Sequence, residues 1–240
     1  MKKIILKCGL YVLRAIMSFI YFFIKMFPVK KNKVLMLSRQ SNEPNIDFKM
    51  LKLEILKYEP NTEIIILCKK IPKKFIKKIS YCFYIIKCMY HIATSSVCIV
   101  DGYEIPVSVL KHKKGLVIVQ IWHALGAIKK FGRQVIDKKE GSNSTIAEIM
   151  RMHKNYTFVT CASEATKNIY AKAFGIEKDK ILVLGMPRID YLLGKDDKIN
   201  NKVQELIQEY PNLKEKENIL YVPTFRKGTN TPIEEIINCI

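Results

Sequence analysis

Acidic residues are scarce in this chain: 22 Asp and Glu stand against 41 Lys and Arg, a formal net charge of +19. Such a surplus favours polyanionic partners, namely nucleic acid, anionic lipid or phosphate-bearing substrates. A lysine-rich coding bias explains the surplus equally well. Nucleic acid is the weakest of these partners and is not predicted, because the sequence has no nucleic-acid-binding motif and few arginines to read bases.

Paired cysteines, metal-ligand spacings and nucleotide-binding loops are also missing. The seven cysteines form no C-x-x-C pair and lie mostly within apolar runs, and the four histidines are scattered. We therefore expect a reducing compartment, no disulfide framework and no metal site. Neither G-x-x-x-x-G-K-[ST] nor G-x-G-x-x-G occurs, which argues against nucleoside triphosphate and dinucleotide folds. No cofactor is predicted.

The N-terminal region lacks an uninterrupted apolar run of membrane-spanning length. Residues 15–24 form a stretch of ten in which only Ser18 is polar, whereas a spanning helix needs ~20 apolar residues. Extension across Arg14 reaches that length at a cost of roughly 2.5–3.5 kcal/mol. No signal-peptide cleavage site follows. We predict that residues 1–32 form a basic, aromatic-rich helix lying on an anionic membrane surface. An ordinary core helix and a single spanning anchor are the alternatives.

From residue 33 onward, short apolar runs alternate with helix-compatible stretches, and 49% of the chain is hydrophobic, enough for a sizeable core. The predicted strands are 33–39, 63–68, 96–102, 115–122, 156–163, 180–185 and 218–223. The predicted helices are 48–57, 75–90, 145–153, 164–174 and 199–210. Strands buried on both faces, alternating with helices, predict an α/β fold with a doubly wound parallel sheet. The polar segment 194–218 reads as a surface helix or a bridge between two lobes.

Polar clusters follow four of these strands, where ligands bind in open α/β sheets. The clusters are Asp101, Gly102 and Tyr103; His123, Gly126, Lys129 and Lys130; Gly185, Pro187, Arg188 and Asp190; and Thr224, Arg226, Lys227 and Gly228. One titratable base among cations and glycines suits the binding and transfer of a phosphoryl group, where positioning and charge neutralisation dominate.

Each candidate residue also has a structural interpretation. Histidine side chains in general can accept a proton near neutral pH, so His123 is a candidate general base, but a histidine at a strand end also serves structure alone. Lys129 and Lys130 are candidate phosphate ligands or a solvated helix face. Arg188 binds phosphate or forms an ion pair with Asp190, and both patterns fit the spacing.

The four clusters, taken in order, resemble the CDP-glycerol glycerophosphotransferase family, the teichoic acid primases and polymerases. The matching segments are QIWHALGAIKKFG (120–132), VTCASEATKNIYAKAFGI (159–176), ILVLGMPRIDYLL (181–193) and ILYVPTFRKG (219–228). The likeness runs from about residue 33 to the end. The basic, hydrophobic N-terminus also matches the family's habit of docking on the inner membrane face.

The resemblance implies a GT-B architecture and the transfer of polyol phosphate from CDP-glycerol or CDP-ribitol to a lipid-linked acceptor, with release of CMP. It makes His123 the catalytic residue, with Ala124 in place of the family's usual glycine. Lys129, Lys130, Arg188 and Asp190 become substrate- or phosphate-binding residues, and so do Thr224 and Arg226. It also implies a peripheral enzyme at the cytoplasmic face of the membrane, with homo-oligomerisation left open.

Three regions are therefore predicted: the membrane-associating segment 1–32, a Rossmann-like acceptor lobe at 33–195, and an inter-lobe helix with the start of a nucleotide-binding lobe at 196–240. The family's second lobe carries most CDP-binding residues and a second histidine, which these 240 residues do not include. We expect little or no turnover from this chain alone. The alternative function is a non-catalytic module that binds anions at a membrane surface.

Overall fold

The computed structural model describes residues 2–72, 74–194 and 197–220. The chain divides into two compact units, Met1–Ile189 and Asp190–Ile240. The first unit holds the sheet and the helices packed on it. In the second unit, the described residues form α8 (Asp197–Glu209), which occupies most of the predicted surface or bridging segment, and the short α9 (Asn212–Glu215).

Six parallel strands form one sheet in the order β2-β1-β3-β4-β5-β6. The strands are β1 (Lys30–Ser38), β2 (Glu63–Cys68), β3 (Ser95–Val100), β4 (Val117–Gln120), β5 (Phe158–Cys161) and β6 (Ile181–Val183). The prediction of a parallel α/β sheet is confirmed, and the first six predicted strands all form. Half of the seventh, residues 221–223 of 218–223, lies outside the described residues.

Helices lie between consecutive strands, as parallel pairing requires, and further helices precede β1 and follow β6. They are α1 (Lys2–Ile24), α2 (Ile46–Tyr58), α3 (Phe75–Thr94), α4 (Ile105–Val109), α5 (Ser144–Ile149), α6 (Glu164–Phe174) and α7 (Pro187–Leu193), with 3₁₀ turns η1 (Gly132–Val135) and η2 (Lys178–Lys180). The short α4 and α7 were not predicted. α6 ends where expected, because Gly175 adopts φ +62° and its N–H donates to the Ala171 carbonyl at 2.8 Å.

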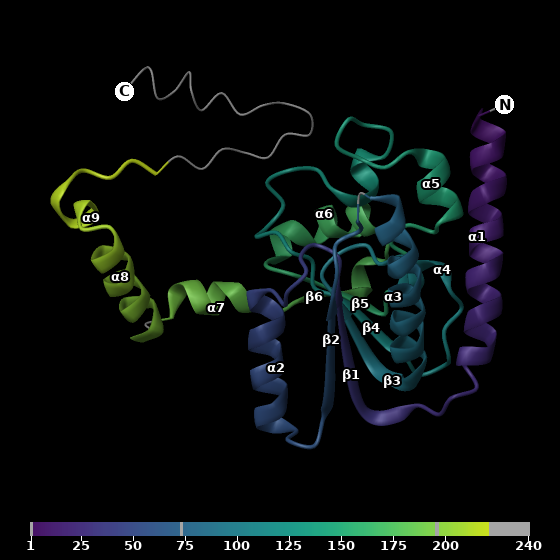
Figure 1. Cartoon of the computed structure of the whole chain (residues 1–240), viewed down its shortest axis with the longest axis horizontal. Helices are drawn as coiled ribbons and strands as arrows, with labels where there is room; N and C mark the ends of the chain where they lie inside the picture. The colour runs from purple at the N-terminus through teal and green to yellow at the C-terminus, as the bar shows by residue number, and fades with distance from the viewer. Residues whose placement is uncertain (1, 73, 195–196, 221–240) are drawn as a thin grey trace. The chain divides into compact units, whose positions relative to one another are not determined.

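Both faces of the sheet are buried, and the strand pleat decides which residue faces which layer. Leu35 and Leu37 belong to a core formed with α1, α3 and α6. Met36, between them, belongs to a second core with Phe48 of α2. Figure 1 shows α2 on one side of the sheet and α3 with α1 on the other. This two-sided cover is what "doubly wound" means.

Helix α1 lies against the first unit through one narrow face. Met17 and Tyr21 are buried, the Arg14 guanidinium donates to the Ile149 carbonyl at 3.3 Å, and the Tyr21 hydroxyl lies 2.9 Å from His112 Nδ1. Most of its large apolar side chains are exposed, which is not the pattern of a core helix. By length and composition, Ile4–Ile24 is long and apolar enough to cross a membrane.

A buried carboxyl group lies directly after β3. Glu104 precedes α4, is only 6% exposed, and its Oε1 has no hydrogen-bond partner among the described residues. Burial raises the pKa of Glu104 to about 8, although the positive charge of Arg39 opposes the rise. At neutral pH the folded chain therefore holds a proton on Glu104 that the unfolded chain does not hold.

We predict that replacing Glu104 with Gln weakens the pH dependence of stability. Because the folded-state pKa lies above the ordinary value, the folded chain holds more protons than the unfolded chain, and stability falls as pH rises toward 8. The wild type loses up to about 1.4 kcal/mol per pH unit from this group, and Glu104→Gln loses less. Urea denaturation between pH 7 and 8.5 measures both slopes.

Burial lowers the pKa of His153 to about 3, so this ring affects the pH dependence of stability mainly between that value and its ordinary pKa. The measured range of pH 7 to 8.5 lies above that interval. Titrations of other groups occur equally in both proteins and cancel in the comparison. Equal slopes in the two proteins contradict the prediction.

Candidate functional site

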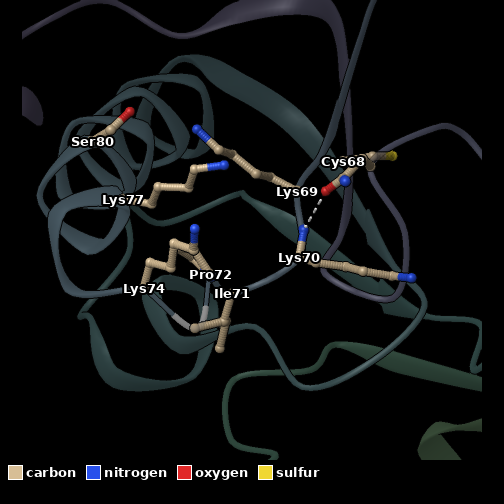
Figure 2. Close-up of a pocket in the computed structure, with 9 residues that line it drawn as sticks. Cys68, Lys69, Lys70, Ile71, Pro72, Lys74, Lys77 and Ser80 are labelled. Atoms are coloured by element: carbon tan, nitrogen blue, oxygen red, sulfur yellow. Dashed lines mark hydrogen bonds between the residues drawn. The ribbon is translucent and has the colours of Figure 1, made fainter.

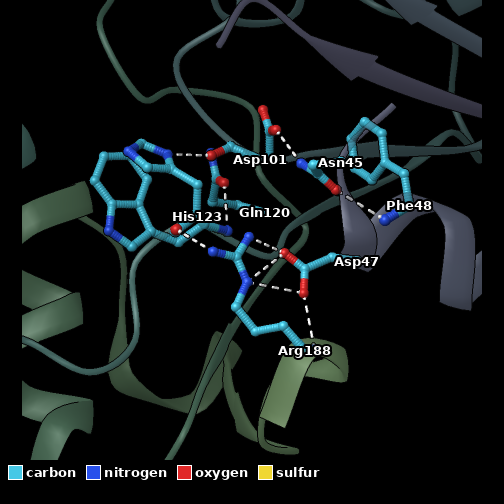
Figure 3. Close-up of polar contacts among 8 residues, drawn as sticks. Asn45, Asp47, Phe48, Asp101, Gln120, His123 and Arg188 are labelled. Atoms are coloured by element: carbon cyan, nitrogen blue, oxygen red, sulfur yellow. Dashed lines mark hydrogen bonds and ion pairs between the residues drawn. The ribbon is translucent and has the colours of Figure 1, made fainter. Parts of the chain in front are cut away.

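The candidate site lies at the carboxyl edge of the sheet, beside the point where the strand order reverses. β2 lies on one side of β1, whereas β3 and all later strands lie on the other, so the switch falls between β1 and β3. Loops diverge at such a point and leave room for a ligand. Residues from the start of α2, the ends of β3 and β4, and the start of α7 meet there (Figure 3).

The ring of His123 is held in one tautomer by its hydrogen bond. Its Nδ1 lies 2.7 Å from the main-chain carbonyl oxygen of Asp101. A carbonyl oxygen only accepts hydrogen bonds, so Nδ1 carries the proton and donates it. In the neutral ring, Nε2 is then left with a lone pair, as a general base requires. The side chain is half-buried.

The backbone immediately before His123 is strained. Trp122 has φ +59°, in the left-handed region that bulky side chains avoid at a cost of about 1–3 kcal/mol. The Trp122 N–H donates to Gln120 Oε1 at 2.8 Å, and its indole stacks on Phe131 with ring centres 4.8 Å apart. The same indole lies 4.1 Å from the His123 ring, centre to centre. The strained turn therefore carries the imidazole.

Gln120 anchors this turn from inside the sheet. It is fully buried, and its Nε2 donates to the Gly102 carbonyl at 2.8 Å and to the Tyr156 hydroxyl oxygen at 3.0 Å. Because its Oε1 accepts from Trp122, one amide joins the end of β4 to the loop after β3. A buried polar group satisfied on both sides resists displacement.

Arg188 pairs with Asp47, which corrects the alternative that Arg188 forms its ion pair with Asp190. Asp47 is fully buried in the first turn of α2, and the Arg188 Nε lies 2.9 Å from its Oδ2. The Arg188 Nη2 also donates to Asp47, and the main-chain N–H of Arg188 donates to Asp47 Oδ1 at 3.0 Å. This hydrogen bonding raises the pKa of Arg188.

The remaining guanidinium nitrogen connects this pair to the candidate base. Arg188 Nη1 donates to the main-chain carbonyl of His123 at 2.9 Å. In this arrangement the Arg188 donors are directed to Asp47 and His123, so the side chain positions the turn that carries the imidazole. Its contact with phosphate stays a prediction.

Other predicted site residues lie farther from these contacts. Lys129 and Lys130 are exposed on the loop after His123, and we find no ion pair for either among the described residues. Asp190 is exposed in α7. Thr224 and Arg226 lie outside the described residues. The roles of all five stay predictions.

Two residues of this site were missed from the sequence. Asn45 accepts the Phe48 N–H through Oδ1 at 2.9 Å, which caps α2, and its Nδ2 donates to Asp101 Oδ2 at 2.7 Å. Asp47 lies in the first turn of that helix. The predicted helix began at Phe48, so both residues were taken as loop. An Asn before an apolar periodic stretch is an N-cap signal and could have identified the correct start.

The site gathers buried carboxyl groups beside one guanidinium. Burial raises the pKa of Asp101, whose side chain is fully buried. Among residues 2–72, 74–194 and 197–220, no three His, Cys, Asp or Glu side chains are grouped to hold a metal ion. The arrangement can hold an imidazole in a fixed position. In the neutral ring its Nε2 carries a lone pair that can accept a proton.

Comparison with known proteins identifies the family of the chain. The family model described as CDP-Glycerol:Poly(glycerophosphate) glycerophosphotransferase matches residues 19–238. The chain belongs to this family. The predicted family resemblance is thereby confirmed.

Relatives of known function are teichoic acid enzymes. The teichoic acid ribitol-phosphate primase of Bacillus spizizenii (strain ATCC 23059 / NRRL B-14472 / W23) is 35% identical over 215 residues, covering 87% of this chain and 55% of the relative. The teichoic acid glycerol-phosphate primase of Bacillus subtilis (strain 168) is 32% identical over 167 residues, covering 70% of this chain and 39% of the relative. The chain thus spans about half or less of the length of these family members.

Solved structures of the wall teichoic acid polymerase TagF share the fold. One TagF variant aligns with a TM-score of 0.56 at 16% identity, covering 88% of this chain and 52% of that chain. A TagF variant soaked with CDPG aligns with a TM-score of 0.56 at 15% identity, covering 95% of this chain and 57% of that chain. At such identity the likeness establishes the fold alone.

We predict that Asp47→Asn lowers the free energy of unfolding of this family member by about 2 kcal/mol. Removing one partner of a buried ion pair costs roughly 3–5 kcal/mol, and the loss is smaller here because the Arg188 side chain is 22% exposed. Urea denaturation measures the change. Asp190→Asn serves as the matched control, because that carboxyl is exposed, and its effect stays within about 0.5 kcal/mol. Equal effects of the two substitutions contradict the assigned pairing.

Proposed function

We propose that the chain contributes the acceptor-activating lobe of a polyol-phosphate transferase, which moves glycerol phosphate or ribitol phosphate from a CDP-alcohol to a lipid-linked acceptor of cell-wall teichoic acid. The single observation that carries this proposal is the His123 tautomer. It leaves a lone pair on Nε2 of the neutral ring at the topological switch point. Membership of the glycerophosphotransferase family supports it.

The proposed reaction assigns one step to His123. Nε2 accepts the proton of an acceptor hydroxyl, and the resulting oxygen nucleophile attacks the phosphorus that carries the polyol. A new P–O bond forms to the acceptor, the P–O bond to CMP breaks, and CMP leaves with the bonding electron pair. General-base catalysis of this kind contributes about 10²- to 10⁴-fold.

The proposed donor follows from the relatives. The names of the two relatives above include ribitol-phosphate and glycerol-phosphate, so CDP-ribitol and CDP-glycerol are both candidates for this chain. The net charge of +19 favours such anionic substrates. Lys129 and Lys130, on the loop after His123, are the proposed ligands for the donor diphosphate.

We further propose that the chain is a peripheral protein at the cytoplasmic face of the membrane. Along α1, exposed aromatic side chains such as Phe19 and Phe23 accompany lysines and an arginine. Arg14 and Tyr21 hold the opposite face of α1 to the first unit. A helix fixed along one side and apolar along the other suits insertion into one leaflet.

The second candidate function is a non-catalytic module that binds anions at the membrane surface. The exposed apolar face of α1 supports this candidate as well, because binding to a membrane through that face requires no reaction at His123. The two candidates differ in whether CMP is released.

We predict that, when acceptor-bearing membranes are present, this chain releases CMP from CDP-glycerol or CDP-ribitol only slowly, in keeping with the little turnover expected from the sequence. We also predict that His123→Asn lowers this slow rate at least about 100-fold, to the background of a sensitive radiolabel assay. The control is His91→Gln, because His91 lies at the C-terminal end of α3, at the opposite edge of the sheet. CMP release from both donors that stays at the background level without enzyme contradicts the transferase and favours the non-catalytic module. An active His123→Asn variant contradicts the assigned base.

We predict that Phe19→Ser/Phe23→Ser lowers binding to phosphatidylglycerol vesicles about 10-fold, because two exposed aromatic side chains no longer enter the bilayer. Vesicle co-sedimentation measures the change. Leu53→Ser, which alters an apolar residue of α2 that is 68% exposed, is the control and leaves binding unchanged. Equal binding by all three proteins rules out α1 as the membrane contact.

A further inference from the structure

A cavity of about 740 Å³ opens where β2 ends and α3 begins. We call it the lysine pocket. Its lining includes four lysines and no carboxylate: Asn42, Cys68, Lys69, Lys70, Ile71, Pro72, Lys74, Lys77 and Ser80. Like charges repel, so cations gathered without an acidic partner favour an anionic ligand.

Three of these lysines share the same space. In Figure 2, the amino groups of Lys69, Lys74 and Lys77 point toward one region, whereas Lys70 points away. Lys69 is further held by the ring of Tyr84, whose centre lies 5.3 Å from Nζ. The main-chain N–H of Lys70 donates to Asn42 Oδ1 at 3.0 Å, which fixes the strand end beside the pocket. Several ammonium groups converging on one point suit a phosphate group.

The first turn of α3 adds to this preference. The helix has 20 residues, so its dipole places partial positive charge at its first turn. Lys74 precedes the helix at the N-cap position, and no side chain caps it there. The lysines and the helix start therefore attract the same ligand charge.

An exposed apolar face of α3 begins beside the pocket. It consists of Ile76, Ile79, Phe83, Ile86 and Tyr90, spaced three or four residues apart. At 3.6 residues per turn these side chains form one stripe, and Ser80 of the pocket lies between this stripe and Lys77. Helix α1 packs against α3, and Phe27, which follows α1 in the chain, lies against Tyr90 with 5.3 Å between ring centres, so the apolar surface continues there. A phosphate site bordered by such a surface matches an amphiphilic ligand.

The pocket shares an edge of the sheet with His123. All six strands are parallel, so the end of β2 and the end of β4 lie on the same edge. Three strand spacings separate β2 from β4, about 14 Å. One extended molecule can therefore reach both places.

We propose that the lysine pocket binds a phosphate group of a membrane lipid, and that this lipid carries the acceptor whose hydroxyl reaches His123. The hydrocarbon part of the lipid lies against the apolar face of α3. The identity of the lipid as acceptor rests on the proposed function. The pocket thus determines that the hydrocarbon end of the acceptor faces the membrane and that its hydroxyl end extends toward His123.

Vesicle binding tests the lysines. With phosphatidylcholine vesicles containing phosphatidic acid, Lys74→Gln/Lys77→Gln is expected to lower binding about 10-fold. The matched control Lys49→Gln/Lys52→Gln removes the same charge from exposed positions on α2, across the sheet, and is expected to change binding less than about twofold. Equal losses in both variants overturn the pocket, because bulk charge then explains binding.

A second arm separates lipid phosphate from free phosphate. Ile79→Ser/Phe83→Ser changes two exposed side chains and is expected to weaken vesicle binding while glycerol 3-phosphate binding stays unchanged. If millimolar glycerol 3-phosphate displaces the wild type from vesicles completely, the pocket takes a soluble phosphate and the lipid assignment is overturned.

Transfer kinetics separate failure of the pocket from failure of the proposed function. Lys74→Gln/Lys77→Gln is expected to raise KM for the lipid acceptor about 10-fold, with kcat and KM for the CDP-alcohol unchanged. If the wild type transfers nothing, the acceptor assignment fails with the proposed function, yet lysine-specific vesicle binding still supports a lipid-phosphate site. If transfer proceeds and the variant matches the wild type, the pocket is wrong and the transferase stands.

Discussion

The ion pair between Asp47 and Arg188 is the contact on which the candidate site depends. It joins residues 141 positions apart, from the first turn of α2 and the first turn of α7. The same guanidinium then holds the carbonyl of His123. A rigid planar group with several donors is needed for these contacts at once, and lysine does not provide it. The imidazole is thus fixed from outside the sheet by Arg188 and from inside by Gln120.

The strands were predictable because burial on both faces makes them continuous apolar runs, and Leu35, Met36 and Leu37 show why. His123 and Arg188 were predicted as site residues because they follow such runs, and the structure places them in contact. Asp47 was not, because nothing local to residues 45–48 reveals a partner near residue 188. Nor does the spacing of Arg188 and Asp190 show that Asp190, although closer in sequence, is not the ion-pair partner of Arg188. Local patterns indicate helices and strands, whereas pairing across the fold requires the topology.

The strained turn at Trp122 fixes the position of the His123 ring at the carboxyl edge of the sheet. A left-handed tryptophan persists only where its surroundings compensate, and here Phe131 and Gln120 do so. For phosphoryl transfer, most of the catalytic benefit comes from placing groups correctly before reaction. The imidazole proposed as the base is held at the switch point in such a fixed placement.

The contacts that dock α1 have an implication for biosynthesis. Arg14 and Tyr21 find their partners 135 and 91 residues later in the chain. A ribosome therefore extrudes this apolar helix well before the strands and loops that receive it. In that interval the apolar face of the emerging helix has no partner within its own chain, so its packing has to wait for the sheet to be completed.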